Sequence, residues 1–184
     1  MQQVFVLTLI SLWSIRLRFA SASLPNILFL VADDLGATDV GWRGSEFPTP
    51  NIDALAYNGI RLENYYVQLV CSPSRTSFLT GRYPIHTGMN HIVIWQDVVA
   101  AIDHQHPTIA EALRDTYGYN QSYHIGKWHA GHAAWNNTPP GRGFEGGWFG
   151  WNGGSSDYYK HTISAQVITL GKVYMFIINI PVPT

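Results

Sequence analysis

The sequence predicts an α/β protein with a mainly parallel sheet, and three observations support this fold class. A short apolar run at residues 25–32 is bounded by a proline and by two aspartates, as expected of a strand buried on both faces. Two helix starts carry a capping residue followed by proline, and a third carries a capping box. Strand and helix signals alternate, which is typical of layered α/β domains. The expected strands are 25–32, 60–67 and 122–125, and the expected helices are 49–56, 72–81 and 108–118.

Two of the expected helices are defined clearly at both ends. Thr49 precedes a proline, apolar residues follow at helical spacing, and Gly59 stops the helix. Thr108 and Glu111 have the spacing of a capping box, and the helix that they open ends near Gly118.

Length and composition predict one globular domain. With 184 residues, 46% apolar side chains and 12% charged ones, the chain can build a core and differs from disordered proteins. The formal net charge is −1 and the few Lys and Arg residues are scattered, so no nucleic-acid partner is expected.

Residues 1–22 are expected to be a signal peptide. An apolar stretch is followed by Ala20, Ser21 and Ala22, whose small side chains fit a signal-peptidase site with cleavage after Ala22. An uncleaved anchor or a buried first strand is the alternative, since arginines follow the apolar stretch instead of preceding it. No stable membrane span is expected, because a span needs about 20 apolar residues. Sequons at Asn120 and Asn136 agree with the secretory pathway and with a lysosomal or extracellular glycoprotein.

The chain after Gly141 is rich in Gly and Trp and is expected to be a loop with local aromatic packing. Residues 167–183 are apolar and β-branched, which favours a last strand. We expect residues 163–184 to be an apolar tail that carries no recognisable catalytic or binding motif.

Asp33 and Asp34 directly follow the first expected strand. Adjacent carboxylates at the end of an apolar strand repel each other, and a hard divalent cation beside them removes that repulsion. A solvated turn that begins with aspartate is the alternative.

Cys71 is the single cysteine, so no intrachain disulfide can form. It precedes Ser72, which with the following proline is expected to start a helix ending at Gly81. A helix N-terminus favours a thiolate and a bound oxyanion, and Arg75, one turn along, can offer donors to sulfate or phosphate. The alternative is a buried, inert cysteine beside a surface arginine.

Lys127 and His129 alternate in an expected extended segment, so both side chains can face one side while Trp128 points into the core. Lysine supplies charge for an oxyanion, and histidine exchanges a proton near neutral pH. An exposed strand face is the alternative. Since these residues, the aspartates and Cys71 all lie where strands end or helices begin, we expect one shared site in the crevice at the sheet edge.

Together these clusters resemble the type I sulfatase family, and within it the arylsulfatase B (N-acetylgalactosamine-4-sulfatase) branch. Residues 71–82 match the family signature C-x-P-S-R-x-x-x-L-T-G-R at every fixed position. Further likeness lies in residues 25–41 (opening strand and metal loop), 126–129 (second signature), 142–144 and 157–159 (following loop). The resemblance covers residues 25–162, which we expect to be the N-terminal part of a catalytic domain.

The resemblance implies an alkaline-phosphatase-like α/β sandwich and a sulfuric ester hydrolase. Cys71 would be converted to formylglycine by the formylglycine-generating enzyme, and one hydroxyl of the hydrated aldehyde would attack the sulfur. The implied substrates are aryl sulfates or sulfated carbohydrates, glycosaminoglycan sugars among them.

The resemblance also implies roles for individual residues. Asp33, Asp34 and the modified Cys71 would bind Ca²⁺. Arg75 would order the site, Lys127 would contact the sulfate oxygens, and His129 would hydrogen-bond the hydrate and help to take its proton.

The chain departs from the family pattern in one respect. The family adds a later Asp-Asn pair to its calcium site and a second histidine and lysine downstream, and none of these is found before Thr184. We therefore expect a partial or truncated sequence or an inactive short form. The alternatives are a zinc-dependent phosphodiesterase or phosphatase of the same superfamily, against which Cys71 argues, and a secreted, non-catalytic protein that binds sulfated glycans or a full-length partner.

Overall fold

The computed structural model describes residues 24–95, 97–150, 152–153 and 173–179. The expected signal peptide at residues 1–22 lies outside the described residues, as does most of the tail at 163–184. Within the described ranges, no helix is long and apolar enough to cross a membrane.

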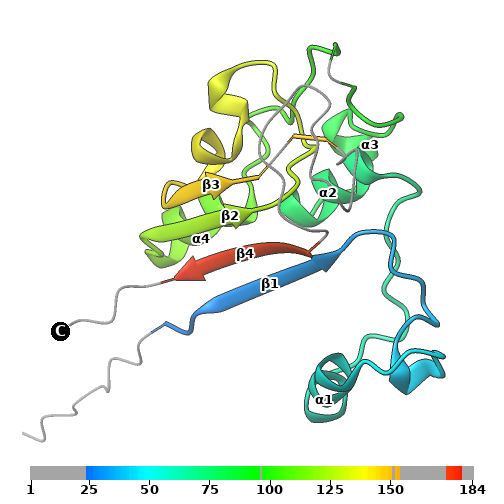
Figure 1. The fold of residues 1–184 in the computed structure, drawn as a ribbon. Helices are drawn as coiled ribbons and strands as arrows, with labels where there is room; N and C mark the ends of the chain where they lie inside the picture. Colours follow the sequence, from blue (N-terminus) through cyan, green and yellow to red (C-terminus); the bar gives the residue numbers. More distant parts are fainter. Residues whose placement is uncertain (1–23, 96, 151, 154–172, 180–184) are drawn as a thin grey trace, which may run out of the picture.

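The centre of the fold is a four-stranded sheet in the order β1-β4-β2-β3 (Figure 1). The strands are β1 (Ile27–Ala32), β2 (Gln121–Ile125), β3 (Gly147–Phe149) and β4 (Val173–Asn179). β2 and β3 are parallel, whereas β4 is antiparallel to both of its neighbours, so Ile178 pairs with Ile27 on one side and with Ser122 on the other. β1, β2 and β3 therefore share one direction. The α/β class is confirmed, and so is a strand within residues 167–183.

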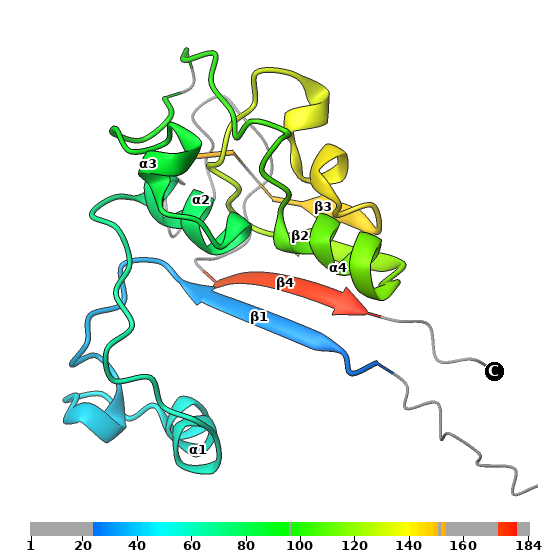
Figure 2. The ribbon, with the colours of Figure 1, turned by 180° about the vertical axis from the view of Figure 1, so that it is seen from behind.

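β1 is an edge strand of the described sheet, which corrects the expectation that it is buried on both faces. Leu28 is 58% exposed and Leu30 is 53% exposed. The apolar run does specify a strand, but burial depends on the layers that cover it, and α4 (Ile109–Tyr117) lies alongside β2 and β4 instead of β1 (Figures 1 and 2).

The residues at its two ends make α4 begin and end where the sequence predicts. The Thr108 hydroxyl accepts a hydrogen bond from the Glu111 amide at 3.2 Å, and the Glu111 carboxylate accepts one from the Thr108 amide at 2.7 Å. Gly118, with φ 75°, ends the helix in the left-handed region that glycine adopts without strain.

The helix α1 (Pro50–Asn58) is also confirmed, with Gly59 after its last residue. The Thr49 hydroxyl does not cap it, but accepts from the Gly41 amide at 2.7 Å and donates to Asp53 at 2.9 Å. This network ties α1 to the 3-10 turn η1 (Gly41–Arg43), and both project away from the sheet (Figures 1 and 2).

The expected strand at residues 60–67 is wrong. The segment forms no strand, and Ile60 is 91% and Val67 66% exposed. Its apolar residues have the composition of a strand, but none of the described strands pairs with it.

The hydrophobic core takes Leu79 from helix α2 (Cys71–Thr80) and Ala110 from α4, and the short helix α3 (Pro84–Thr87) packs against α2. Trp128 and Phe144 are fully buried and meet edge to face with centroids 6.2 Å apart. Two 3-10 turns, η2 (Trp135–Asn137) and η3 (Pro139–Arg142), come before or at the start of the expected loop, and the strand β3 gives the region after Gly141 more regular structure than the sequence predicts. The rest of the core is Met89, Ile94, Ile102 and Ala130.

Candidate active site

Cys71 is the first residue of α2, and its thiol is half-buried. Val70 precedes the helix and offers no capping side chain, while Ser72, which the sequence suggested as the cap, lies inside the helix. The amide groups of the first turn are therefore directed toward the region around Cys71, where they favour negative charge.

Lys127 joins Cys71 to Asp33. Its ammonium lies 3.1 Å from the Cys71 sulfur and 3.0 Å from Oδ2 of Asp33. Because the Lys127 side chain is only 6% exposed, this cation is held in the protein and not in solvent. The exposed-face alternative for Lys127 is therefore wrong.

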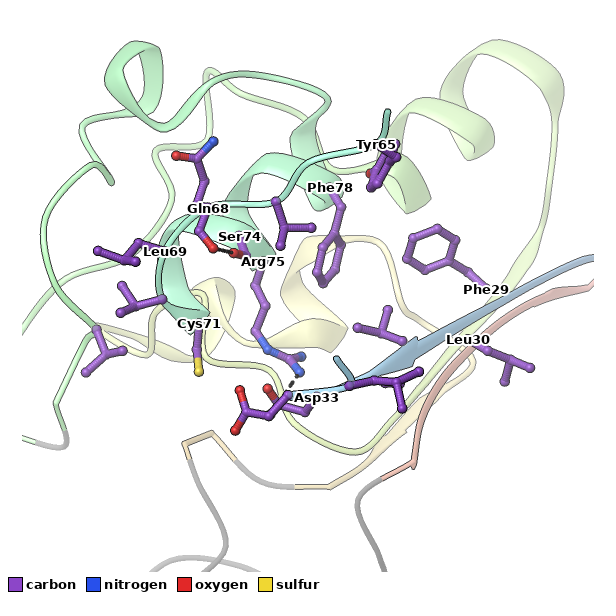
Figure 3. A pocket seen from close by; sticks show the side chains of 17 residues that line it. Phe29, Leu30, Asp33, Tyr65, Gln68, Leu69, Cys71, Ser74, Arg75 and Phe78 are labelled. Carbon is purple, nitrogen blue, oxygen red and sulfur yellow. Dashed lines mark hydrogen bonds and ion pairs between the residues drawn. The ribbon is translucent and has the colours of Figure 1, made fainter. Parts of the chain in front are cut away.

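Arg75 is buried in the same cluster and is 3% exposed. Its guanidinium donates a hydrogen bond to the backbone carbonyl of Lys127, and it lies 3.7 Å from Oδ2 of Asp33 (Figure 3). Arg75 thus fixes the backbone that carries Lys127 and adds a second positive charge beside Asp33. The alternative of a surface arginine is wrong.

Asp33 and Asp34 lie at the C-terminal end of β1, beside Cys71. Asp34 is exposed and has φ 62°, an uncommon conformation for a residue with a side chain. Both carboxylates fit calcium in donor type, since Ca²⁺ prefers oxygen ligands. Within the described ranges, however, no group of three or more His, Cys, Asp or Glu residues is gathered to hold a metal. Asp33 and Asp34 are therefore candidate ligands that no third described side chain of these types joins.

His129 is 7% exposed and has φ 52°. Nε2 of its ring lies 3.1 Å from the Ile94 carbonyl, and the structure places the ring against Ile94 instead of bonding it to Cys71. Burial, followed by the charge of Lys127, lowers the pKa of His129 to about 4. The imidazole is therefore neutral at physiological pH.

Buried residues of this region that the sequence did not single out are Ser72 and His124. The Ser72 hydroxyl accepts from the Ile94 amide at 3.0 Å. His124 packs edge to face against Trp128 at 5.5 Å, and burial, then the Arg75 charge, holds its pKa well below the ordinary value. The place of Ser72 next to Cys71 could have indicated a part in the site. Nothing in the sequence indicated His124, because its neighbours in the structure are distant in sequence.

A cavity of about 540 Å³ opens beside this cluster (Figure 3). Its polar end holds Asp33, Asp34, Cys71 and Arg75, and most of its remaining wall is apolar. The apolar part includes the tilted aromatic pair Phe29 and Phe78, whose centroids are 5.6 Å apart, together with Leu30, Val31, Tyr65, Val67, Leu69 and Val93. The arrangement suits a ligand with an anionic head at Cys71 and a less polar body.

The family model named Sulfatase matches residues 25–174. The chain belongs to the sulfatase family. Arylsulfatase J of Mus musculus is 44% identical over 142 residues, which are 77% of this chain and 23% of that protein. Human steryl-sulfatase is 38% identical over 125 residues, which are 64% of this chain and 21% of that protein.

Solved structures agree with this assignment. The crystal structure of Ps i-CgsB has a TM-score of 0.62 and 35% identity, with coverage of 70% of this chain and 28% of that one. The alkaline-phosphatase-like fold expected from the resemblance is confirmed for this sulfatase. The sequence spans about a quarter of the length of these relatives.

Proposed function

We propose that this sulfatase hydrolyses sulfate monoesters with a nucleophile made from Cys71. The observation that carries the proposal is the position of the Lys127 ammonium, 3.1 Å from the Cys71 sulfur and 3.0 Å from Asp33. A buried cation beside the N-terminus of α2 stabilises negative charge, which a sulfate ester brings to the site and which increases on the leaving oxygen.

Conversion of the Cys71 thiol to formylglycine supplies a hydrated aldehyde, one hydroxyl of which attacks sulfur while the other later helps to expel sulfate. The Sγ atom of Cys71 marks where an aldehyde oxygen would stand. Lys127 then contacts both this oxygen and the sulfate, and Arg75 keeps Lys127 in place through its backbone carbonyl. By the family resemblance, His129 would hydrogen-bond the hydrate and help to take its proton.

Asp33 and Asp34 would hold Ca²⁺, which supplies positive charge to lower the pKa of the attacking hydroxyl. Asp33 already faces Lys127 and Arg75, so the ion would share this carboxylate with two side-chain cations. Asp34 is exposed at the cavity and is the more accessible of the two ligands.

We propose sulfated carbohydrates or aryl sulfates as the substrate class, glycosaminoglycan sugars among the former. The names of arylsulfatase J and steryl-sulfatase support an ester with an apolar body, which the apolar wall of the cavity accepts. A structure of Ps i-CgsB contains k-i-k-neocarrahexaose, which supports an oligosaccharide. The proposed location is the secretory pathway, lysosomal or extracellular, where the formylglycine-generating enzyme would act on the chain.

The test is turnover of 4-nitrophenyl sulfate by the chain co-expressed with the formylglycine-generating enzyme and supplied with calcium. Turnover is expected for the wild type and not for Cys71→Ala. Zinc-dependent hydrolysis of 4-nitrophenyl phosphate that survives Cys71→Ala would instead indicate the phosphatase alternative. Binding of sulfated glycan without any turnover would indicate the non-catalytic one.

A further inference from the structure

Ser72 is a buried polar residue next to the nucleophile for which the mechanism above gives no role. It is 1% exposed, and its hydroxyl accepts a hydrogen bond from the Ile94 amide at 3.0 Å. The two residues are 22 positions apart in sequence, so this bond ties the segment around Ile94 to the first turn of α2.

Ile94 connects Ser72 to His129. Its amide donates to Ser72, while its carbonyl lies 3.1 Å from Nε2 of His129, and Ile94 itself is 6% exposed. Both polar groups of one buried residue are thus engaged, the first by the residue beside Cys71 and the second by the expected proton acceptor.

The carbonyl determines which ring nitrogen of His129 carries the hydrogen. A carbonyl oxygen only accepts, so the bond requires the hydrogen on Nε2. A neutral imidazole then has its lone pair on Nδ1, and this atom has no hydrogen-bond partner among the described residues. The ring therefore holds its basic atom, Nδ1, buried and without a partner among the described residues.

We infer that Ser72 is a positioning residue, which fixes Ile94 and thereby holds His129 in the tautomer with a hydrogen on Nε2 and a basic Nδ1. This inference rests on the proposed function only in giving Nδ1 a proton to accept. The His129 backbone has φ 52°, which lies outside the commonly populated conformations. The hydrogen bond between its ring and the Ile94 carbonyl therefore helps to hold the side chain in place.

Serine suits this role because its hydroxyl accepts from a buried amide at close range. Alanine removes the acceptor and leaves the Ile94 amide without a partner in a buried place, so the segment shifts to satisfy it. Threonine keeps the acceptor. Position 72 is also a variable position of the C-x-P-S-R signature, so substitutions there leave the modification motif intact.

The test is the tautomer of His129, measured by long-range ¹H–¹⁵N NMR of imidazole-labelled full chain, with His129→Gln used to assign the resonances. The wild type is expected to show hydrogen on Nε2 as the main tautomer, with hydrogen on Nδ1 as a minor population. Ser72→Ala is expected to raise the population with hydrogen on Nδ1 by about fivefold, the effect of one lost neutral hydrogen bond. Ser72→Thr is expected to restore the wild-type ratio.

Ser77→Ala is the matched control, because Ser77 lies in the same helix and its hydroxyl donates to the Pro73 carbonyl at 2.9 Å, not to Ile94. It is expected to leave the tautomer unchanged. The inference is overturned if Ser72→Ala keeps the wild-type tautomer, or if Ser77→Ala changes it as much. The measurement needs no formylglycine, so failure of the catalytic proposal and failure of this inference are separate results.

Discussion

Replacing Arg142 with methionine is expected to cost a large part of the stability of this domain. Arg142 is fully buried, and its guanidinium donates to the Ile102 carbonyl at 2.8 Å and to the His106 carbonyl at 2.6 Å. It also pairs with Glu111 at 3.2 Å. Methionine fills a similar volume but leaves two carbonyls without the Arg142 donor and the Glu111 carboxylate without its cation.

The expected loss is about 3–5 kcal/mol of the free energy of unfolding, the usual result of removing one partner of a buried ion pair. Domains of this kind have only about 5–15 kcal/mol in total. The loss also reaches the site, since the Ile102 amide donates to the Ala130 carbonyl at 3.2 Å, one residue after His129.

Urea unfolding followed by tryptophan fluorescence measures the effect. Arg114→Met is the control, because Arg114 forms ion pairs with Asp115 and Glu145 but its side chain is 37% exposed. Exposed pairs contribute about 0–1 kcal/mol. The reasoning is refuted if Arg142→Met costs less than about 1 kcal/mol, or no more than Arg114→Met.

Four further predictions concern the helix cap, the site and its titration. Thr108→Ala is expected to cost about 1–2 kcal/mol in the same unfolding assay, because it removes the α4 cap, while Thr108→Ser should cost clearly less. Lys127→Met is expected to lower kcat for 4-nitrophenyl sulfate about 100-fold with its circular dichroism spectrum unchanged; a loss below about threefold contradicts its role. His129 has a pKa of about 4 in the folded chain against 6.5 ordinarily, so the unfolded chain binds more protons between these values. At about 1.4 kcal/mol per pKa unit, stability should fall by about 3 kcal/mol as pH drops from 6.5 to 4, with His124 acting in the same direction, and His129→Gln should flatten the dependence. Calcium at 100 times its Kd should stabilise the chain by about 2.7 kcal/mol in a thermal melt, and an equal shift in Asp34→Asn would argue against Asp34 as a ligand.

Features governed by neighbours in sequence were predicted well. The capping box of Thr108 and Glu111 depends on residues three positions apart, and the structure confirms both of its hydrogen bonds. The run at 25–32 likewise specifies a strand. Its burial does not follow from the run, because Leu28 and Leu30 depend on elements far away in the chain.

Features governed by distant contacts were visible only in part: one shared site was predicted, but not the individual contacts that build it. Lys127 and Cys71 are 56 positions apart, and their contact follows from the meeting of β1, α2 and the segment after β2. Arg142 is charged and suggests an exposed residue, yet acceptors 31 to 40 positions away bury it. Ile94 carries no chemical signal, since its two polar contacts are made by backbone atoms.

Mass spectrometry of the peptide that contains Cys71 tests the central claim most directly. The chain is co-expressed with the formylglycine-generating enzyme, and Arg75→Ala, which breaks the C-x-P-x-R motif, serves as the control. The wild-type peptide is expected to have lost its sulfur and gained the aldehyde oxygen, while the control keeps its thiol. An unmodified thiol in the wild type, in cells that convert another sulfatase, would contradict a catalytic role for Cys71.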